Sequence, residues 1–319
     1  MSPPLGYLDA AGRRAATILP LTWALLAISI VVCVVIGIIL WRAVQRAETS
    51  GGAAETRAVR VTRGSDGIHW IKFGLLISAV PLLVALVWTM VALASSSEPP
   101  SGRALTLEVT PHQWWWEVQY TSADPSATFA TANEIHIPVG VPVLVQLHGA
   151  DVIHSFWVPK LTGKTDAIPG RTNASWLQAD APGRYRGQCQ EFCGAQHAHM
   201  SFTVVAEPQA QFEAWRAHQL QPAPAPQTPE QMRGRDLVEY RCGLCHKVRG
   251  TTAGAINGPD LTHVMSRAEI ASGTLPNNAG TLAGWILNPQ ALKPGTLMPA
   301  QGLAGTQLAD TVAYLETLK

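Results

Sequence analysis

The sequence predicts a multidomain membrane protein with a two-helix transmembrane hairpin, an all-β domain and a small all-α domain, in that order. Three observations support this class: two long stretches lack charge, short alternating strands follow them, and a proline-rich segment precedes a final helical region. Only 14% of the 319 residues are charged, against about 25% in an average soluble domain. The net charge of +1 gives no electrostatic reason to expect nucleic-acid binding.

Two uncharged stretches are each long enough to cross a ~30 Å bilayer as a helix. Between Arg14 and Arg42 lie 27 uncharged residues, and between Lys72 and Glu98 lie 25. A cleaved signal peptide is the alternative for the first stretch, but the stretch is long and no small-residue cleavage site follows it. The predicted boundaries are residues 1–102 for this part, with spans at about 17–41 and 71–95.

Basic residues beside the two spans predict how they are oriented. The N-terminal tail carries Arg13 and Arg14, and the segment after the second span carries Arg103. The connecting loop and its edges carry six basic residues: Arg42, Arg46, Arg57, Arg60, Arg63 and Lys72. Because basic loops stay on the cytoplasmic side, we expect a cytoplasmic loop in a bacterial cell membrane. Both termini and all residues after 97 are then external, where cysteines meet an oxidising compartment.

Residues 103–207 are predicted to form the all-β domain. Short runs alternate between apolar and polar residues, and proline, glycine and aspartate interrupt them often. Several short strands over about 100 residues indicate a sandwich or a Greek-key barrel. The clearest runs are Leu105–Val109, Glu134–Ile137, Val143–Leu147 and Ser201–Val205.

A cluster of metal-ligand residue types lies at the end of this domain. Cys189 and Cys193 are four residues apart, His197 follows four residues later, and Met200 follows after three more. Thiolate, imidazole and thioether form a soft ligand set, which suits copper. A mononuclear blue-copper site needs one cysteine, whereas two thiolates can bridge two copper ions, each with one terminal histidine.

The second histidine must then come from elsewhere, and His154 is the natural candidate. The alternatives for the cysteine pair are a disulfide in an exported domain or a zinc site. The nearby His197 and Met200 favour copper over both. Five other histidines are expected to be ordinary hydrogen-bonded or solvated side chains: His112, His136, His148, His199 and His218.

The C-terminal domain is predicted to carry a covalent haem. Residues 208–228 form a short helix and a proline-rich linker, and residues 229–319 form the domain, whose first helix Thr228 caps. Cys242-Gly-Leu-Cys245-His246 is the Cys-x-x-Cys-His attachment signature of c-type haem. A thioredoxin-like redox pair or half a zinc site is the alternative, but no βαβ pattern and no second cysteine pair accompany it.

The β domain resembles subunit II of haem–copper cytochrome c oxidase, which carries the dinuclear copper centre CuA. The matching stretches are Ala150–Phe156, Lys164–Arg171, Gly187–Met200 and the aromatic run His112–Trp116. The resemblance implies a cupredoxin barrel and the following ligands. Cys189 and Cys193 are the bridging thiolates, His154 and His197 the terminal ligands, Met200 a weak ligand, and Glu191 a ligand through its backbone carbonyl.

The same resemblance implies roles for three further side chains. The Glu191 carboxylate would also bind a magnesium ion at the boundary with subunit I. Trp114 matches the tryptophan through which electrons reach the copper centre, and Asp151 would support a ligand or contact another subunit. The family often has a glutamate near a proton-uptake path at the start of the second span. Here Asp66 is the carboxylate in that region, so a proton-uptake role for this chain stays open.

The C-terminal domain resembles class I cytochrome c. Asn257–Leu261 matches the loop that supports the proximal histidine, and Pro294–Pro299 matches the loop that carries the distal methionine. The resemblance therefore implies thioether bonds at Cys242 and Cys245 and axial ligation by His246 and Met298. Met265 competes as the sixth ligand, but it lies only 19 residues after His246 and no proline follows it. Histidine–methionine ligation suits electron transfer.

Together these resemblances imply an electron-transfer subunit of a proton-pumping cytochrome c oxidase. Electrons would pass from haem c to CuA and on to haem in subunit I, where oxygen is reduced, so this chain has no catalytic site of its own. The implied partners are subunit I, subunit III, membrane lipid, and an upstream cytochrome c or quinol–cytochrome c reductase complex. The alternatives are a CuA-containing nitric oxide reductase subunit and a membrane-anchored electron carrier or copper-handling protein without a catalytic partner.

Overall fold

The computed structural model describes residues 5–49, 66–99, 105–303 and 305–319. The chain divides into two compact units, Ala16–Glu98 and the combination of Met1–Ala15 with Pro99–Lys319. Four arginines used to predict the membrane orientation lie outside the described residues: Arg57, Arg60, Arg63 and Arg103. Asp66 begins the second long helix, but its side chain also lies outside the described part.

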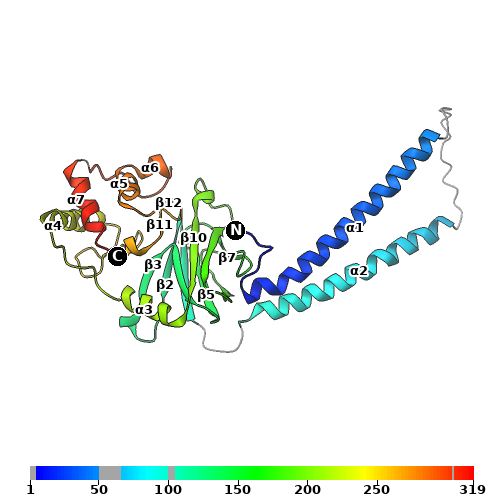
Figure 1. Ribbon diagram of the computed structural model, residues 1–319, viewed down its shortest axis with the longest axis horizontal. Coiled ribbons are helices and arrows are strands. Elements are labelled where there is room, and N and C mark those ends of the chain that lie inside the picture. The colour runs from blue at the N-terminus through cyan, green and yellow to red at the C-terminus, as the bar shows by residue number, and fades with distance from the viewer. Residues whose placement is uncertain (1–4, 50–65, 100–104, 304) are drawn as a thin grey trace. The chain divides into compact units, whose positions relative to one another are not determined.

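Two long helices make up the helical unit, α1 (Arg13–Thr49) and α2 (Asp66–Ser97) (Figure 1). Both are long and apolar enough to cross a membrane, and large apolar side chains along them, such as Leu40 and Leu82, are exposed. This pattern fits helices whose apolar surface faces hydrocarbon rather than a protein core. Both helices extend beyond the predicted spans and include polar or charged residues on either side of the apolar stretch.

Two five-stranded sheets form the β domain, with strand orders β3-β2-β1-β5-β8 and β4-β10-β9-β6-β7 (Figure 1). Large apolar side chains from both sheets are fully buried in one core, and the domain is a β-sandwich of the expected cupredoxin class. The four runs predicted as strands are confirmed. The strands are β1 Leu105–His112, β2 Trp115–Tyr120, β3 Phe129–Ala132, β4 Glu134–Pro138, β5 Val143–His148, β6 His154–Trp157, β7 Thr165–Ala167, β8 Thr172–Leu177, β9 Gly183–Cys189 and β10 Ser201–Glu207.

Strand register brings the predicted copper ligands to one end of the second sheet. β6 pairs antiparallel with β9, and Phe156 lies opposite Cys189. β9 in turn pairs with β10, and Gln188 lies opposite Ser201. His154 at the start of β6 and the loop between β9 and β10 therefore meet at the same edge.

The helix α3 (Gln209–Gln219) follows the sandwich and packs Phe212 into its core. The C-terminal domain is helical, as predicted, with one two-stranded sheet (Figure 1). Its elements are α4 Pro229–Leu237, the π-helix Val238–Cys242, β11 Glu269–Ile270, β12 Leu275–Pro276, α5 Ala279–Leu287, α6 Pro289–Leu292 and α7 Thr306–Leu315. Three short 3-10 helices complete the described elements: Pro125–Ala127, His197–His199 and Val264–Ser266.

The helices α4 and α7 cross closely and frame the C-terminal domain. Thr228 caps α4 as predicted, because its side chain accepts a hydrogen bond from the backbone of Gln231. A Cβ atom at Gly234 would lie 1.9 Å from the carbonyl oxygen of Asp310 on α7, so only glycine permits this crossing. Arg233 donates two hydrogen bonds, of 2.7 and 2.9 Å, to the Asp310 carboxylate.

Candidate metal centres

The segment between β9 and β10 brings the predicted copper ligands together. The sulfur atoms of Cys189 and Cys193 are 3.9 Å apart. Nδ1 of His197 and Sδ of Met200 lie 3.6 and 3.8 Å from the Cys193 sulfur. The Cys189 sulfur lies 3.3 Å from the carbonyl oxygen of Glu191. The loop thus places five of the six predicted donor groups in one cluster.

The sixth donor comes from β6, as expected. His154 is fully buried, and its Nδ1 atom lies 3.8 Å from the Cys189 sulfur. Its other ring nitrogen, Nε2, is 2.8 Å from a carboxylate oxygen of Asp151. A carboxylate partner on the far nitrogen is the usual support of a metal-bound histidine, because it fixes the tautomer and the ring orientation. Asp151 therefore leaves Nδ1 free to face the two sulfur atoms.

The thiol groups of Cys189 and Cys193 lie close enough for each to alter the pKa of the other. The Cys193 thiol beside Cys189 lowers the pKa of Cys189, against the opposing effect of burial. The same contact, together with burial, raises the pKa of Cys193. A bound cation removes this difference, because metal ligation favours both thiolates. The pair is therefore prepared to bind a positively charged centre.

The chemistry of this donor set fits a pair of copper ions. Among the described residues, His154, Cys189 and Cys193 form a buried group with donor atoms close enough to share a metal. Two sulfur atoms lie between two imidazole nitrogens, with a thioether and a carbonyl oxygen at the sides. Soft sulfur and imidazole ligands favour copper over hard cations. A disulfide does not fit this geometry, since the sulfur atoms are well beyond bonding distance.

Trp114 connects this cluster to the C-terminal domain. Its indole Nε1 donates a 2.9 Å hydrogen bond to the carbonyl oxygen of Cys193. A Cβ atom at Gly295 would lie 3.5 Å from Cη2 of the same indole, so the ring also touches the loop that carries Met298. The side chain is buried. It is thus in contact with both ligand loops.

A cavity of about 370 Å³ lies in the C-terminal domain, bounded on one side by the β domain. Cys242, Cys245, His246 and Met298 all line it, so the four predicted haem-binding residues meet at one cavity. Trp114 forms part of its wall. The lining is mainly apolar, as the porphyrin ring of a haem requires.

The proximal histidine is held in the orientation that iron ligation needs. His246 Nδ1 donates a 2.7 Å hydrogen bond to the carbonyl oxygen of Pro259, which leaves Nε2 for a metal. A Cβ atom at Gly258 would lie 2.7 Å from the imidazole ring, so only glycine lets this loop pack against it. Burial lowers the pKa of His246 and keeps the imidazole neutral, as a ligand must be. These residues fit a covalently bound haem.

The Glu191 carboxylate and five histidines lie outside the copper and haem clusters. The Glu191 carboxylate is partly exposed and lies 3.4 Å from Nζ of Lys164. The other histidines contact partners outside the copper cluster, as expected. His112 meets Glu117, His136 meets Glu134 and Glu207, His148 meets Glu108, His199 meets Gln196, and His218 packs against His263.

Two contacts at the site have no signal in the sequence. The Gln113 side chain donates a 2.7 Å hydrogen bond to the Cys193 carbonyl oxygen. Nζ of Lys293 donates a 2.7 Å hydrogen bond to the backbone oxygen of Trp114. Gln113 lies within the aromatic run His112–Trp116, but nothing in that run indicates a bond to Cys193. Lys293 follows α6, and a lysine at such a position is ordinarily exposed.

Comparisons with known proteins agree with this arrangement. The family described as cytochrome c oxidase subunit II, periplasmic domain, matches residues 123–207, and the cytochrome c family matches residues 231–319. Cytochrome c oxidase subunit 2 of Alkalihalophilus pseudofirmus is 35% identical over 79% of this chain and 72% of that protein. The subunit 2 of Bacillus sp. PS3 is 31% identical over 77% of this chain and 71% of that protein.

A solved structure of the periplasmic domain of cytochrome oxidase subunit II from Bradyrhizobium japonicum is 34% identical. It covers 37% of this chain and 95% of that one, with a TM-score of 0.35. The relatives and the two family matches both indicate a cytochrome c oxidase subunit II with a cytochrome c domain. The two clusters of candidate ligands agree with this. The chain belongs to the cytochrome c oxidase subunit 2 family and is a membrane-anchored subunit of an oxidoreductase.

Proposed function

We propose that this chain carries electrons from a covalent haem c to a dinuclear CuA centre within one polypeptide. Cys242 and Cys245 would attach the haem, and His246 and Met298 would ligate its iron. Cys189 and Cys193 would hold the copper pair. Electrons then pass to haem in subunit I, where oxygen is reduced to water and protons are translocated. The remaining copper ligands are His154, Glu191 through its carbonyl, His197 and Met200.

The contact of Trp114 with both ligand loops is the observation that carries this proposal. Its indole donates to the carbonyl of the copper ligand Cys193 and packs against Gly295, three residues before Met298. It also lines the cavity that holds His246. One side chain therefore offers a short route between the two centres. No intervening solvent is required.

The residues around both centres favour electron transfer over bond chemistry. When bound, haem and copper would each supply one-electron redox chemistry. Asp151 holds His154, and the Pro259 carbonyl holds His246, so both imidazoles are fixed from behind. Rigid ligands change little between oxidation states, which lowers the reorganisation cost.

We also propose the cofactor and membrane arrangement that the sequence suggested. The Glu191 carboxylate, which is partly exposed, would bind a magnesium ion together with ligands from subunit I. The loop between α1 and α2 is cytoplasmic, and both termini are external. Subunit III and an upstream cytochrome c or quinol–cytochrome c reductase complex complete the set of partners. The proposed domain boundaries are 1–102, 103–207, 208–228 and 229–319.

Metal analysis and turnover of the purified complex test the proposal. We expect two copper ions and one iron per copy of this chain, and oxygen consumption that depends on electrons entering at haem c. One copper ion, or zinc in its place, would contradict the dinuclear assignment. Reduction of nitric oxide in place of oxygen would identify the partner as a nitric oxide reductase. If this chain did not co-purify with a large haem protein, the result would favour the alternative of a membrane-anchored electron carrier without a catalytic partner.

A further inference from the structure

A lysine of the haem domain is buried at the contact with the β domain. Lys293 is only 2% exposed. Its Nζ atom donates hydrogen bonds to the backbone oxygens of Trp114, at 2.7 Å, and Ala271, at 3.2 Å. Burial lowers the pKa of Lys293 to about 7. The two carbonyl oxygens replace water as hydrogen-bond acceptors for its ammonium group. Lysine is almost never fully buried unless its ammonium group is paired.

The position of this lysine links it to the haem ligand loop. Lys293 follows α6 and directly precedes the loop that contains Met298. The Gln290 side chain donates to the carbonyl oxygens of Thr296 and Met298 and accepts from the amide of Gly295. These three hydrogen bonds stabilise the loop between Lys293 and Met298. Contacts that fix the position of Lys293 therefore also restrict the position of Met298. A second bond, from Gln196 Nε2 to the Pro294 oxygen at 2.8 Å, joins the same loop to the copper loop.

We infer that Lys293 is the positioning residue that fixes the haem ligand loop against Trp114 and thereby sets the haem-to-copper separation. This inference rests on the proposed function. Trp114 is held at two points: its indole binds the copper loop, and its backbone oxygen binds the haem loop through Lys293. The two ligand loops consequently share one anchor. Electron transfer then takes place within a docked pair and needs no search by a tethered domain.

A second group of contacts shows that the two domains pack closely. Ser272 is buried, and its hydroxyl donates to the Ser201 carbonyl oxygen at 2.9 Å, while its own carbonyl accepts from the Ser201 amide at 3.2 Å. A Cβ atom at Gly273 would lie 2.4 Å from the Ser201 hydroxyl. Arg186 donates a 2.8 Å hydrogen bond to the carbonyl oxygen of Gly273 and forms an ion pair with Glu269.

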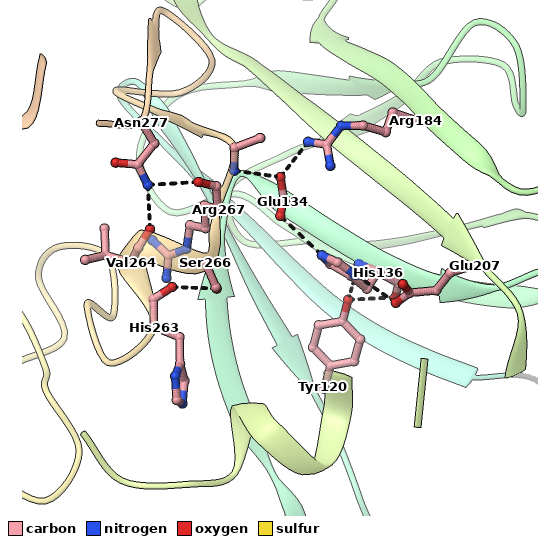
Figure 2. Close-up of polar contacts among 11 residues, drawn as sticks. Tyr120, Glu134, His136, Arg184, Glu207, His263, Val264, Ser266, Arg267 and Asn277 are labelled. Atoms are coloured by element: carbon pink, nitrogen blue, oxygen red, sulfur yellow. Dashed lines mark hydrogen bonds and ion pairs between the residues drawn. The ribbon is translucent and has the colours of Figure 1, made fainter. Parts of the chain in front are cut away.

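Glu134 adds a contact at the far end of the same interface. Its carboxylate accepts hydrogen bonds from Arg184 and from the backbone amide of Ala268. Figure 2 shows Glu134 between Arg184 and His136, beside the haem-domain segment that includes Arg267. The linker is also attached to the haem domain, because Arg249 donates to the carbonyl oxygen of Gln219. The haem domain is thus held along a continuous surface, with Lys293 at the end nearest the metal sites.

Lys293→Met in the full chain tests the inference, with Lys319→Met as the matched control. Lys319 is exposed and belongs to the same domain. We expect Lys293→Met to slow haem-to-copper electron transfer after flash reduction of the haem by at least about tenfold. The visible spectrum of the haem should not change, since Lys293 is not a ligand. Lys293→Arg should restore most of the rate, and Lys319→Met should match the wild type.

Amide hydrogen exchange at Ser201 provides a readout that does not depend on the metals. Its amide is bonded to Ser272 across the interface, so exchange should accelerate at least about tenfold in Lys293→Met. Unchanged Ser201 protection, or an unchanged transfer rate, would overturn the role of Lys293. Absence of haem-to-copper transfer in the wild type would instead contradict the proposed function, and Ser201 exchange would still decide the role of Lys293.

Gly273→Ala tests the same interface at a second position. The new Cβ would strike Ser201 and Arg186 of the β domain. Gly302→Ala is the matched control, because both glycines have positive φ (72° and 63°) and Gly302 faces open space. We expect slower transfer and faster Ser201 exchange in Gly273→Ala alone. Equal behaviour of the two variants would show that close docking at this interface is not required.

Discussion

The indole nitrogen of Trp114 lies 2.9 Å from the carbonyl oxygen of Cys193 and donates a hydrogen bond to it. Cys193 is a proposed copper ligand, and the opposite side of the indole meets the haem ligand loop at Gly295. The bond therefore joins the outer edge of one metal centre to a ring that contacts the other.

Trp114→Phe should slow electron transfer from haem c to CuA by roughly tenfold, which corresponds to a barrier about 1.4 kcal/mol higher. The substitution keeps an aromatic ring but removes the hydrogen bond to Cys193. Flash-induced transfer in the full chain measures the effect. Trp215→Phe is the control, since Trp215 packs against His136 away from both centres, and it should leave the rate unchanged. Equal rates in the two variants would rule out Trp114 as the route.

Asp151→Asn should weaken copper binding by roughly 10- to 100-fold, the usual cost of losing the carboxylate behind a metal-bound histidine. Asp151 accepts hydrogen bonds from His154 Nε2 at 2.8 Å and from the Gln113 amide at 2.6 Å. Competition with a copper chelator measures the affinity. Asp180→Asn, at an exposed position of the same domain, should bind copper normally. Wild-type affinity in Asp151→Asn would show that His154 needs no such support.

Met298→Ala should convert the haem to a high-spin form and lower its midpoint potential, because a thioether ligand is lost from the iron. Met298 lines the haem cavity together with His246. The visible spectrum and a redox titration measure both effects. Met265→Ala tests the competing methionine, which packs at the edge of the haem-domain core. A normal spectrum in Met298→Ala with a high-spin haem in Met265→Ala would reverse the assignment.

Stability should fall as the pH drops through the range in which Glu134 titrates. Burial raises the pKa of Glu134, but hydrogen bonds from His136 and Arg184 outweigh it and lower the pKa from 4.5 to about 2 (Figure 2). The unfolded state binds this proton first, so the stabilisation is complete above pH 4.5 and is lost as the pH falls towards 2. The shift corresponds to about 3 kcal/mol.

Denaturant unfolding of the wild type and Glu134→Gln across this pH range measures that contribution. The variant should be less stable than the wild type at neutral pH, and the difference should shrink in acid. Glu316→Gln removes an exposed carboxylate at the end of α7 and should keep the full pH dependence. A constant difference between wild type and Glu134→Gln at all pH values would contradict the assignment.

Local spacing made the individual ligand loops predictable from the sequence. Cys189, Cys193, His197 and Met200 lie within 12 residues, and Cys242, Cys245 and His246 within five, so short-range geometry alone brings them together. The predicted strands and the cap at Thr228 rest on equally local patterns. The two helices run past the predicted spans because hydropathy marks the apolar stretch rather than the helix ends.

The interface could not be predicted in the same way. Lys293 and Trp114 are 179 positions apart, and nothing near Lys293 indicates that its ammonium group is buried. Ser272 forms its contacts with the other domain, at Ser201 and Asn133, and no local pattern indicates them. Such contacts depend on the complementarity of two folded surfaces, which a periodic pattern in one segment does not encode. For the same reason the sequence does not predict the hydrogen bond that the Gln113 backbone amide donates to the Asp151 carboxylate, although both residues lie in stretches that match the family.

The burial of Trp114 also limits which molecules can supply electrons. The side chain is only 8% exposed, and a loop of the chain's own haem domain lies over it. A soluble carrier that collides with the docked protein therefore finds no open indole surface. Under the proposed route, an external carrier would deliver its electrons to the outer face of the haem domain. Because that domain belongs to the same polypeptide as the copper-binding residues, each copper site would have its own electron acceptor.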